Sequence, residues 1–256
     1  MSSILIGKCN KNDPYAKMDC QTRNLVLKRI AHAFKKHNVN VVRLKTDVKQ
    51  LIWVRDVYIP IDNTYVIGNL TKKSTLGRNR VNEYKELEYL LDSNPEIKQI
   101  KPSKDVKLEG GDIIQYKDYI FVGIGGRTNK EGYEFIKRTF KHKKVIAINH
   151  TALHLDCVLC VLDNDVVFYD SKYIQRLPRN FRQLFNVNDI SSIVDSGKFL
   201  ATNFVKIGKT LIISNTPENS AFRDILKGMG YKLEIVNTEN IWRSGGSVRC
   251  LTQWLL

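Results

Sequence analysis

The chain has 256 residues, of which 43% are hydrophobic and 26% are charged, and its formal net charge is +15. This length and composition suit one domain with a full hydrophobic core, which we expect to span residues 1–256. No stretch approaches the roughly 18 consecutive apolar residues of a membrane span. The apolar segment at residues 4–7 is too short for the core of a signal peptide. We therefore expect a cytoplasmic protein that does not enter a membrane.

The high positive charge raises the question of a nucleic-acid partner. The lysines are scattered, however, and no nucleic-acid-binding motif accompanies the densest basic run, at residues 141–144. Charge clusters alone are weak signals. A solvated basic surface is the favoured interpretation, and nucleic acid is the less favoured partner.

The five cysteines are an odd number in a long chain, which predicts reduced thiols and not a disulfide framework. Cys157 and Cys160 form a CxxC pair, but a structural zinc site needs two further ligands, and Cys9 and Cys20 do not form a second pair. The CxxC pair lies in an apolar run typical of a strand, in which residues i and i+3 point to opposite faces. We interpret both as core residues and expect no metal and no cofactor.

In chain order, a short strand at residues 4–7 precedes a helix at 22–36 and a strand at 39–42. A pattern of strand, strand, helix and strand then recurs. The predicted hairpins lie at residues 57–61 with 65–67, 112–116 with 119–122, 157–162 with 166–169, and 203–207 with 210–213. The helices that follow lie at residues 81–91, 130–140, 179–185 and 217–229, and the closing strands at 97–100, 145–148, 192–194 and 233–236.

These hairpins recur roughly every 45 to 55 residues, a spacing that indicates a propeller or an array. A fifth hairpin is due near the C-terminus, where residues 248–256 offer one strand and residues 4–7 offer its partner. Pairing of the two termini would close a ring and remove exposed sheet edges. We predict an α/β fold of five ββαβ units closed by the N- and C-terminal strands. An open α/β sheet is the alternative.

Polar residues gather where the chain enters each hairpin. The entry segments are WVRD at 53–56, LEGGD at 108–112, HLD at 154–156, ATN at 201–203 and GGSVRC at 245–250. If the units are equivalent, these segments lie at one end of the ring and converge on its axis. Carboxylates, a histidine and a cysteine would then share one pocket, as groups at functional sites do.

Cys250 follows a glycine pair, and a thiol held beside such a turn is a candidate nucleophile if a base lies nearby. The alternative is a buried structural cysteine. Several carboxylates around a thiol suit a planar cation with many N–H donors, and a guanidinium pairs with carboxylates in a bidentate manner. The pattern therefore predicts attack on a guanidinium carbon.

Four of these motifs, WVRD, EGGD, HLD and GGSVRC, resemble in their order those of the guanidine-modifying superfamily, the penteins. The superfamily includes arginine deiminases, dimethylarginine dimethylaminohydrolases, agmatine deiminases and amidinotransferases. The resemblance extends from residue 4 to residue 256. It implies a five-bladed α/β propeller, which agrees with the count of units.

The resemblance also implies roles for the entry residues. Cys250 would be the nucleophile, and His154 would protonate the leaving amine and then activate water. Glu109 would orient His154 or balance its charge. Asp56 and Asp156 would hold the guanidinium nitrogens.

Further substrate-binding candidates come from the same comparison. Asp112 and Asn203 lie at hairpin entries. Arg127, in the segment FVGIGGRTN, resembles the arginine that holds the substrate α-carboxylate in arginine deiminases, which favours an amino-acid substrate over agmatine. Arg78 or Arg80 resembles a second carboxylate-binding arginine, and Arg80 is preferred.

These residues together predict a hydrolase that converts arginine, or an N-substituted arginine, to citrulline through a covalent amidino-thioether on Cys250. The alternatives are an amidinotransferase with an amine acceptor, an arginine dihydrolase that forms ornithine, and a non-catalytic ribosome-binding propeller. The EGGD motif favours the hydrolase over the transferase. The expected partner is a small guanidino compound. The sequence leaves open whether the chain forms a homodimer.

Overall fold

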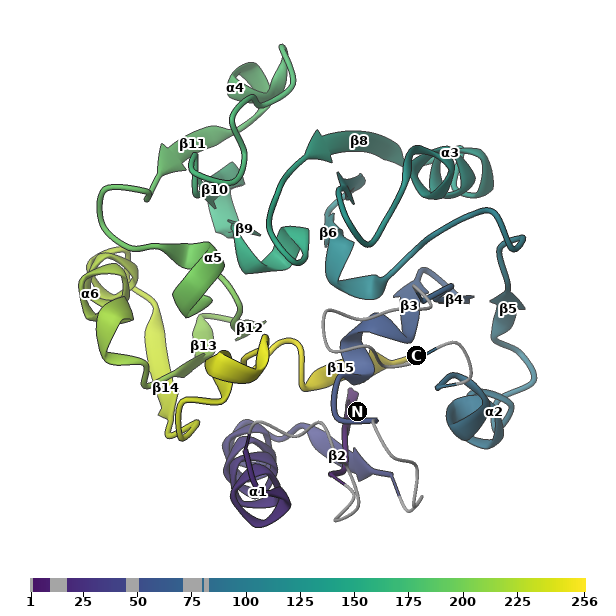
Figure 1. Cartoon of the computed structure of the whole chain (residues 1–256), viewed down its shortest axis with the longest axis horizontal. Helices are drawn as coiled ribbons and strands as arrows, with labels where there is room; N and C mark the ends of the chain where they lie inside the picture. Colours follow the sequence, from purple (N-terminus) through teal and green to yellow (C-terminus); the bar gives the residue numbers. More distant parts are fainter. Residues whose placement is uncertain (1, 10–17, 45–50, 71–79, 81–82) are drawn as a thin grey trace.

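The computed structural model of the protein describes residues 2–9, 18–44, 51–70, 80 and 83–256. Within these residues, five three-stranded sheets surround a common axis, with α1, α2, α3, α4 and α6 toward the periphery (Figure 1). The ring of five α/β units predicted from the repeat is confirmed. No helix among the described residues has both the length and the apolar character needed to cross a membrane.

Each sheet is one blade with an inner antiparallel pair and an outer parallel strand. The blades are β15 (Thr252–Leu255), β1 (Ser3–Ile6) and β2 (Asn40–Arg43); β3 (Tyr58–Ile61), β4 (Thr64–Ile67) and β5 (Lys98–Ile100); β6 (Ile113–Tyr116), β7 (Tyr119–Ile124) and β8 (Lys144–Asn149); β9 (Leu159–Val161), β10 (Val166–Tyr169) and β11 (Asn186–Asp189); and β12 (Val205–Ile207), β13 (Thr210–Ser214) and β14 (Lys232–Val236). A helix precedes the outer strand of each blade. These helices are α1 (Cys20–Lys36), α2 (Lys85–Leu91), α3 (Lys130–Thr139), α4 (Phe181–Leu184) and α6 (Ser220–Gly228).

The two ends of the chain complete one blade. Strand β1 pairs antiparallel with β15, so that Ser3 lies opposite Leu255 and Ile6 lies opposite Thr252. Because β15 belongs to the last segment of the chain and β1 to the first, this pairing joins the termini as predicted. It also places the turn before β15, which carries Cys250, next to the centre of the ring (Figure 1).

The helices form where apolar residues recur at helical spacing, and α1 is an example. Its N-cap Asp19 accepts a hydrogen bond from the backbone of the first turn, which satisfies a donor that the helix leaves unpaired. Val26, Ile30 and Phe34 lie on one face and are fully buried. They pack in one cluster with Ile212 of the neighbouring blade. Burial of each such side chain contributes about 1.5–3 kcal/mol, so this cluster holds the two adjacent blades together.

The prediction of a strand at residues 192–194 is wrong. The outer strand of this blade is β11, a polar segment whose backbone pairs with β10. It ends at Asp189, whose side chain accepts hydrogen bonds from the backbone N–H groups of Ser171 and Ser191. Residues 192–194 instead lead into a short helix that the sequence pattern did not predict, α5 (Ser196–Phe199).

The CxxC pair is buried, as predicted, but not in one strand. Cys157 lies in a 3-10 turn before β9, and only Cys160 lies in the strand. The two side chains belong to separate apolar clusters. Cys157, Cys160 and Cys250 are free cysteines, which form no disulfide in the structure.

Candidate active site

The entry segments of the five hairpins form short turns at the centre of the ring. Three of them are 3-10 turns: η1 (Val54–Asp56) before β3, η2 (Gly110–Asp112) before β6, and η3 (Leu155–Cys157) before β9. The entry to β12 follows α5, and the entry to β15 follows a fourth 3-10 turn, η6 (Ile241–Ser244). The polar side chains that these turns carry contact one another, as the sequence predicted.

His154 lies in a cluster of carboxylates and is 3% exposed. Its Nε2 atom is 2.9 Å from Oε2 of Glu109, and its Nδ1 atom is 3.8 Å from Oδ1 of Asp56. Burial alone would lower the pKa of His154, but the negative charges of Asp56, Glu109 and Asp112 outweigh it and raise that pKa well above its ordinary value. His154 is therefore held as an imidazolium that can give up a proton.

Two arginines balance the charge of these carboxylates. Arg80 donates from Nη1 to Oδ2 of Asp56 at 2.9 Å, and its Nε and Nη2 atoms donate to Glu83. Arg127 lies with Nη1 at 3.6 Å from Oε1 of Glu109. Burial opposes ionisation of Glu109, but the hydrogen bond with His154 and the charges of both arginines keep its pKa below its ordinary value. Glu109 is thus a fixed anion behind the imidazolium.

Cys250 lies in the turn before β15 and is 3% exposed. The Asn203 side chain donates from Nδ2 to the sulfur of Cys250 and to Oδ1 of Asp156, both at 3.2 Å. The backbone N–H of Cys250 donates in turn to Oδ1 of Asn203 at 3.2 Å. Asn203 therefore fixes the thiol and a carboxylate relative to each other.

Asp156 also meets two arginines. Its Oδ2 atom is 3.5 Å from Nε of Arg55 and 3.3 Å from Nε of Arg249. Burial raises the pKa of Asp156, against the pull of the two positive charges. Arg55 donates to Oε1 of Gln253 at 2.8 Å and to the carbonyl of Ile113 at 2.6 Å. Its own burial and the repulsion from Arg249 lower the pKa of Arg55 to about 10.

Three carboxylate oxygens in the site are buried without a hydrogen-bond partner among the described residues: Oδ1 of Asp56, Oδ2 of Asp112 and Oδ2 of Asp156. The contacts of Asp156 with Arg55 and Arg249 are close enough for ion pairs, yet they lack the direction of hydrogen bonds. A buried charged oxygen that lacks a hydrogen bond is costly. A cation with several N–H donors would satisfy the oxygens of Asp56 and Asp156.

Asp112 makes contacts of a different kind. Its Oδ1 atom accepts from the backbone N–H of Leu155 at 2.9 Å and lies 3.0 Å from Nε2 of His150. Asp112 therefore supports the turn that carries His154. The sequence analysis did not single out His150, because nothing in its neighbours along the chain indicates this contact between the end of β8 and the start of β6.

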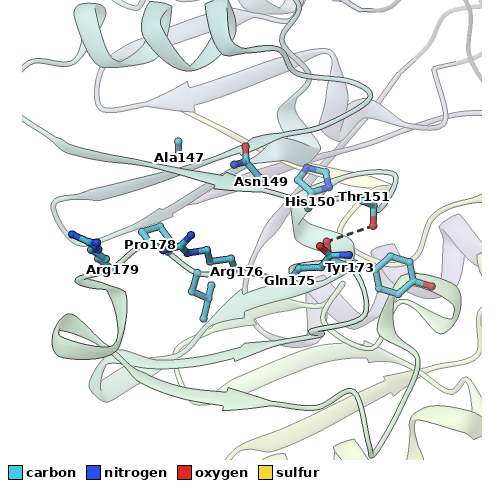
Figure 2. A pocket seen from close by; sticks show the side chains of 10 residues that line it. Ala147, Asn149, His150, Thr151, Tyr173, Gln175, Arg176, Pro178 and Arg179 are labelled. Atoms are coloured by element: carbon cyan, nitrogen blue, oxygen red, sulfur yellow. Dashed lines mark hydrogen bonds between the residues drawn. The ribbon is translucent and has the colours of Figure 1, made fainter.

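A pocket of about 690 Å³, which His150 helps to line, lies between β8 and the segment after β10 (Figure 2). Its polar lining includes Asn149, Thr151, Arg176 and Arg179. None of the sequence-predicted site residues lines this pocket. It is a neighbour of the candidate active site and not part of it.

Glycines permit two close approaches in the site. Gly245 has a φ of +89°, in the left-handed region that favours glycine, and a Cβ atom on Gly246 would overlap the ring of Trp53. A Cβ atom on Gly111 would lie 2.6 Å from Cγ of His154. The glycine pair before Cys250 thus serves the turn and its packing against η1.

In the part of the chain that the structure describes, two groups of side chains have metal-ligand atoms within 4.8 Å of one another: Asp56 with Glu109 and His154, and Asp156 with Cys157 and Cys250. In the first group the arginines already neutralise the carboxylates. The expectation that the site works without a metal stays a prediction. Arg78, the alternative to Arg80, lies outside the described residues.

The geometry can be compared with known proteins. The family model described as arginine deiminase matches residues 15–194. The chain belongs to the arginine deiminase family. Among curated relatives of this family member, YkgA of Bacillus subtilis (strain 168), an uncharacterized protein, is 26% identical over 265 residues, which cover 98% of this chain and 86% of YkgA. An uncharacterized protein of Aeropyrum pernix is 26% identical over 204 residues, which cover 75% of this chain and 70% of that protein.

Solved structures share the fold. The amidinotransferase SxtG of Microseira wollei superposes with a TM-score of 0.82 at 17% identity, covering 99% of this chain and 93% of SxtG. The DDAH of Pseudomonas aeruginosa in complex with citrulline gives 0.79 at 17% identity, covering 99% and 98%. The N-terminal domain of ArgZ, a cyanobacterial arginine dihydrolase, gives 0.76 at 13% identity, covering 100% and 97%. This arginine deiminase family member is therefore a pentein.

Proposed function

We propose that this arginine deiminase family member hydrolyses the guanidinium group of arginine, or of an N-substituted arginine, to citrulline and ammonia or an amine. One observation carries the proposal. Asp56, beside His154, and Asp156, beside Asn203, each have a buried oxygen that lacks a hydrogen bond. Asn203 also donates to the sulfur of Cys250. A guanidinium supplies donors to both oxygens at once.

Binding would also prepare the nucleophile. A guanidinium held by Asp56 and Asp156 brings a positive charge to the sulfur of Cys250, and a nearby cation favours a thiolate. Asn203 adds a hydrogen bond from Nδ2 to the same sulfur. The thiolate then lies beside a cationic carbon that it can attack, and much of the catalytic effect is one of position.

In the first half-reaction, the sulfur of Cys250 forms a bond to the guanidinium carbon and the bond from that carbon to the leaving nitrogen breaks. The proton of the His154 imidazolium passes to the leaving nitrogen, which departs as ammonia or an amine. The raised pKa of His154 keeps this proton available at neutral pH. Glu109 supports the imidazolium at 2.9 Å until the proton is transferred.

In the second half-reaction, neutral His154 takes a proton from water, and the hydroxide adds to the carbon of the amidino-thioether. The bond from carbon to sulfur then breaks, the hydroxyl proton of the tetrahedral intermediate is lost to solvent, the Cys250 thiolate returns and citrulline is released. Only an acid–base group and a nucleophile are needed, and both belong to this chain.

The remaining predicted residues fall into two roles in this proposal. Arg127 would bind the α-carboxylate of the substrate. Arg80 and Asp112 were predicted to bind substrate, but their contacts favour positioning roles, since Arg80 donates to Asp56 and Glu83 while Asp112 holds His150 and the η3 backbone.

A product screen tests the proposal. The protein is incubated with arginine, methylated arginines and agmatine, and the products are separated by chromatography. We expect citrulline from arginine or a methylated arginine, and less turnover of agmatine, which lacks the carboxylate that Arg127 would bind.

The other reactions of the superfamily give different outcomes in the same screen. Ornithine without citrulline would indicate a dihydrolase, and a new guanidino compound on addition of glycine or lysine would indicate an amidinotransferase. No turnover of any guanidine, together with salt-sensitive RNA binding that Cys250→Ser leaves unchanged, would contradict an enzymatic role.

A further inference from the structure

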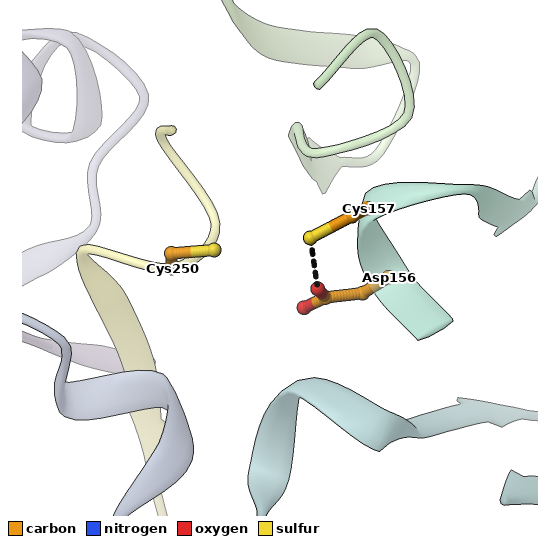
Figure 3. A group of neighbouring side chains, drawn as sticks. All are labelled: Asp156, Cys157 and Cys250. Atoms are coloured by element: carbon orange, nitrogen blue, oxygen red, sulfur yellow. Dashed lines mark hydrogen bonds between the residues drawn. The ribbon is translucent and has the colours of Figure 1, made fainter. Parts of the chain in front are cut away.

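A second thiol lies beside that of Cys250. The sulfur atoms of Cys157 and Cys250 and a carboxylate oxygen of Asp156 lie within 4.8 Å of one another. Figure 3 shows the two cysteine side chains pointing toward each other, one from η3 and one from the turn before β15. The proposed hydrolysis uses only one of these thiols.

Cys157 has no task in that reaction. It is fully buried, and its thiol donates to Oδ1 of Asp156 at 3.7 Å. A hydrogen bond with the sulfur of Cys250, burial and the charge of Asp156 raise the pKa of Cys157 well above its ordinary value. While Cys250 is reduced, Cys157 therefore stays a protonated thiol and does not compete as a nucleophile for the substrate.

We propose that Cys157 is the resolving cysteine of an oxidative modification of the active site, in which hydrogen peroxide oxidises Cys250 and a Cys157–Cys250 disulfide then forms. The geometry carries this inference, because a reactive thiol and a second thiol are placed side by side by different blades. The loss of activity that we expect on oxidation rests on the proposed function, whereas the disulfide itself does not.

The chemistry balances with peroxide as the only co-reactant. The sulfur of Cys250 attacks one peroxide oxygen, the O–O bond breaks, and a sulfenic acid and one water result. The sulfur of Cys157 then attacks the sulfur of Cys250, the S–O bond breaks, and the Cys157 proton leaves with the hydroxide as a second water. Two thiols are oxidised and one peroxide is reduced.

Burial determines which oxidant can act. Cys250 is 3% exposed, so a small molecule such as hydrogen peroxide is favoured over a protein disulfide. A disulfide bond is about 2.0 Å long, so both sulfurs would leave their present positions, and Cys250 could no longer attack a substrate. The disulfide would also stop oxidation before the sulfinic acid, which thiols do not reduce.

The test uses the whole chain, fully reduced, in buffer with a chelator so that metal binding by the thiols plays no part. Wild type, Cys157→Ser and Cys160→Ser are treated with a small excess of hydrogen peroxide, and peptides are mapped by mass spectrometry. Cys160→Ser is the matched control, because Cys160 is also buried and belongs to the same CxxC pair but packs in another cluster. If Cys157→Ser does not fold, as judged by circular dichroism, Cys157→Ala replaces it.

We expect a Cys157–Cys250 peptide in the wild type and in Cys160→Ser, with most of the citrulline-forming activity restored by dithiothreitol. In Cys157→Ser, Cys250 should proceed to the sulfinic acid, and the activity restored by dithiothreitol should fall by at least about fivefold. Sulfinic acid at Cys250 in all three proteins without a disulfide, or a disulfide from Cys250 to Cys160, would overturn the inference.

The failure of each proposal can be told apart. A mapped Cys157–Cys250 disulfide in a protein that turns over no guanidine contradicts the proposed function alone. Citrulline formation by a protein that forms no such disulfide contradicts the resolving role of Cys157 alone.

Discussion

The candidate site has two halves that share a plan and differ in chemistry. In the His154 half, Asp56 is held by Arg80, and in the Cys250 half, Asp156 is held by Asn203. Each aspartate keeps one buried oxygen without a hydrogen bond. The first half concentrates carboxylates around an imidazole, whereas the second places an amide and a second thiol around the nucleophile.

The difference shows that separate turns at the centre of the ring contribute to proton transfer and to nucleophilic attack. Proton transfer depends on η1, which contains Asp56, and on Glu109, which caps η2. Nucleophilic attack depends on the entries to β12 and β15, which carry Asn203 and Cys250. The η3 turn joins the halves, because His154 caps it and Asp156 lies within it. One short turn thus contributes the acid to one half and a carboxylate to the other.

The largest effect is expected in the Cys250 half. Cys250→Ser removes the nucleophile and should lower kcat for the guanidino substrate by at least about 10⁴-fold. The buried contacts of the His154 half do not involve this sulfur, so the melting temperature by circular dichroism should change little. Cys160→Ser is the control and should retain activity. Retained turnover in Cys250→Ser would contradict the proposed role of Cys250 as the nucleophile.

The next effect belongs to the His154 half. His154→Asn removes the group that we expect to protonate the leaving nitrogen and activate water, and kcat should fall by about 10²–10⁴-fold. His142→Asn is a suitable control, because His142 lies on the surface beside Asp62. A loss in His154→Asn no larger than that in the control would contradict an acid–base role.

The two halves should also differ in stability. Asp156→Asn leaves the charges of Arg55 and Arg249 without their common anion, and loss of one partner from a buried pair costs about 3–5 kcal/mol of unfolding free energy. The control is Asp163→Asn, whose partners Lys206 and Lys209 are at the surface, where an ion pair contributes about 0–1 kcal/mol. Urea unfolding measures both, and equal losses would argue against a buried ion cluster at Asp156.

The smallest effect is a shift in pH dependence. Since the pKa of His154 is raised in the folded protein, its contribution to stability is full below its unfolded pKa of about 6.5 and is lost as pH rises through the folded value. Glu109→Gln removes a carboxylate that raises this pKa, so the alkaline loss of stability should begin at a lower pH.

On the acid side, the pH dependence of stability has the opposite sign. Glu109 itself, with a lowered pKa, stabilises above its unfolded pKa of about 4.3, and this contribution is lost as pH falls. Melting temperatures measured from pH 2 to 10 should therefore differ most between wild type and Glu109→Gln at about pH 4.3 to 6.5, and the difference should shrink below and above this window. The exposed Glu96→Gln is the control, and identical profiles for all three proteins would show that Glu109 does not set the charge of His154.

The ring itself could be predicted from the sequence because its signals are local. Each hairpin has apolar strands around a polar turn, and the turns contain residues with positive φ, among them Asp62, Lys117, Asn164 and Gly208. The polar strand β11 escaped prediction because its place comes from backbone pairing with β10 and not from apolar side chains. The short helix α5 was missed in the same region.

The site could be predicted only in part. The entry motifs identified Asp56, Glu109, His154, Asp156 and Cys250, because their positions repeat from unit to unit. The ion pairs of Asp156 with Arg55 and Arg249 and the approach of Cys157 to Cys250 depend on distances between blades. The contact of His150 with Asp112 depends on the pairing of strands within one blade. No spacing along the chain encodes these distances. The cytoplasmic location, the single domain over residues 1–256, the lack of a cofactor and a homodimer stay predictions.

In the proposed reaction, Cys250 attacks the guanidinium carbon while Asp56 and Asp156 hold the guanidinium group. The most direct test mixes a slight excess of enzyme with arginine, quenches the reaction in acid during the first turnover, and maps the peptides by mass spectrometry. We predict an adduct on Cys250 with the mass of arginine less ammonia, which forms and then decays as citrulline appears. Citrulline without any adduct, or an adduct on Cys157 instead, would contradict the account.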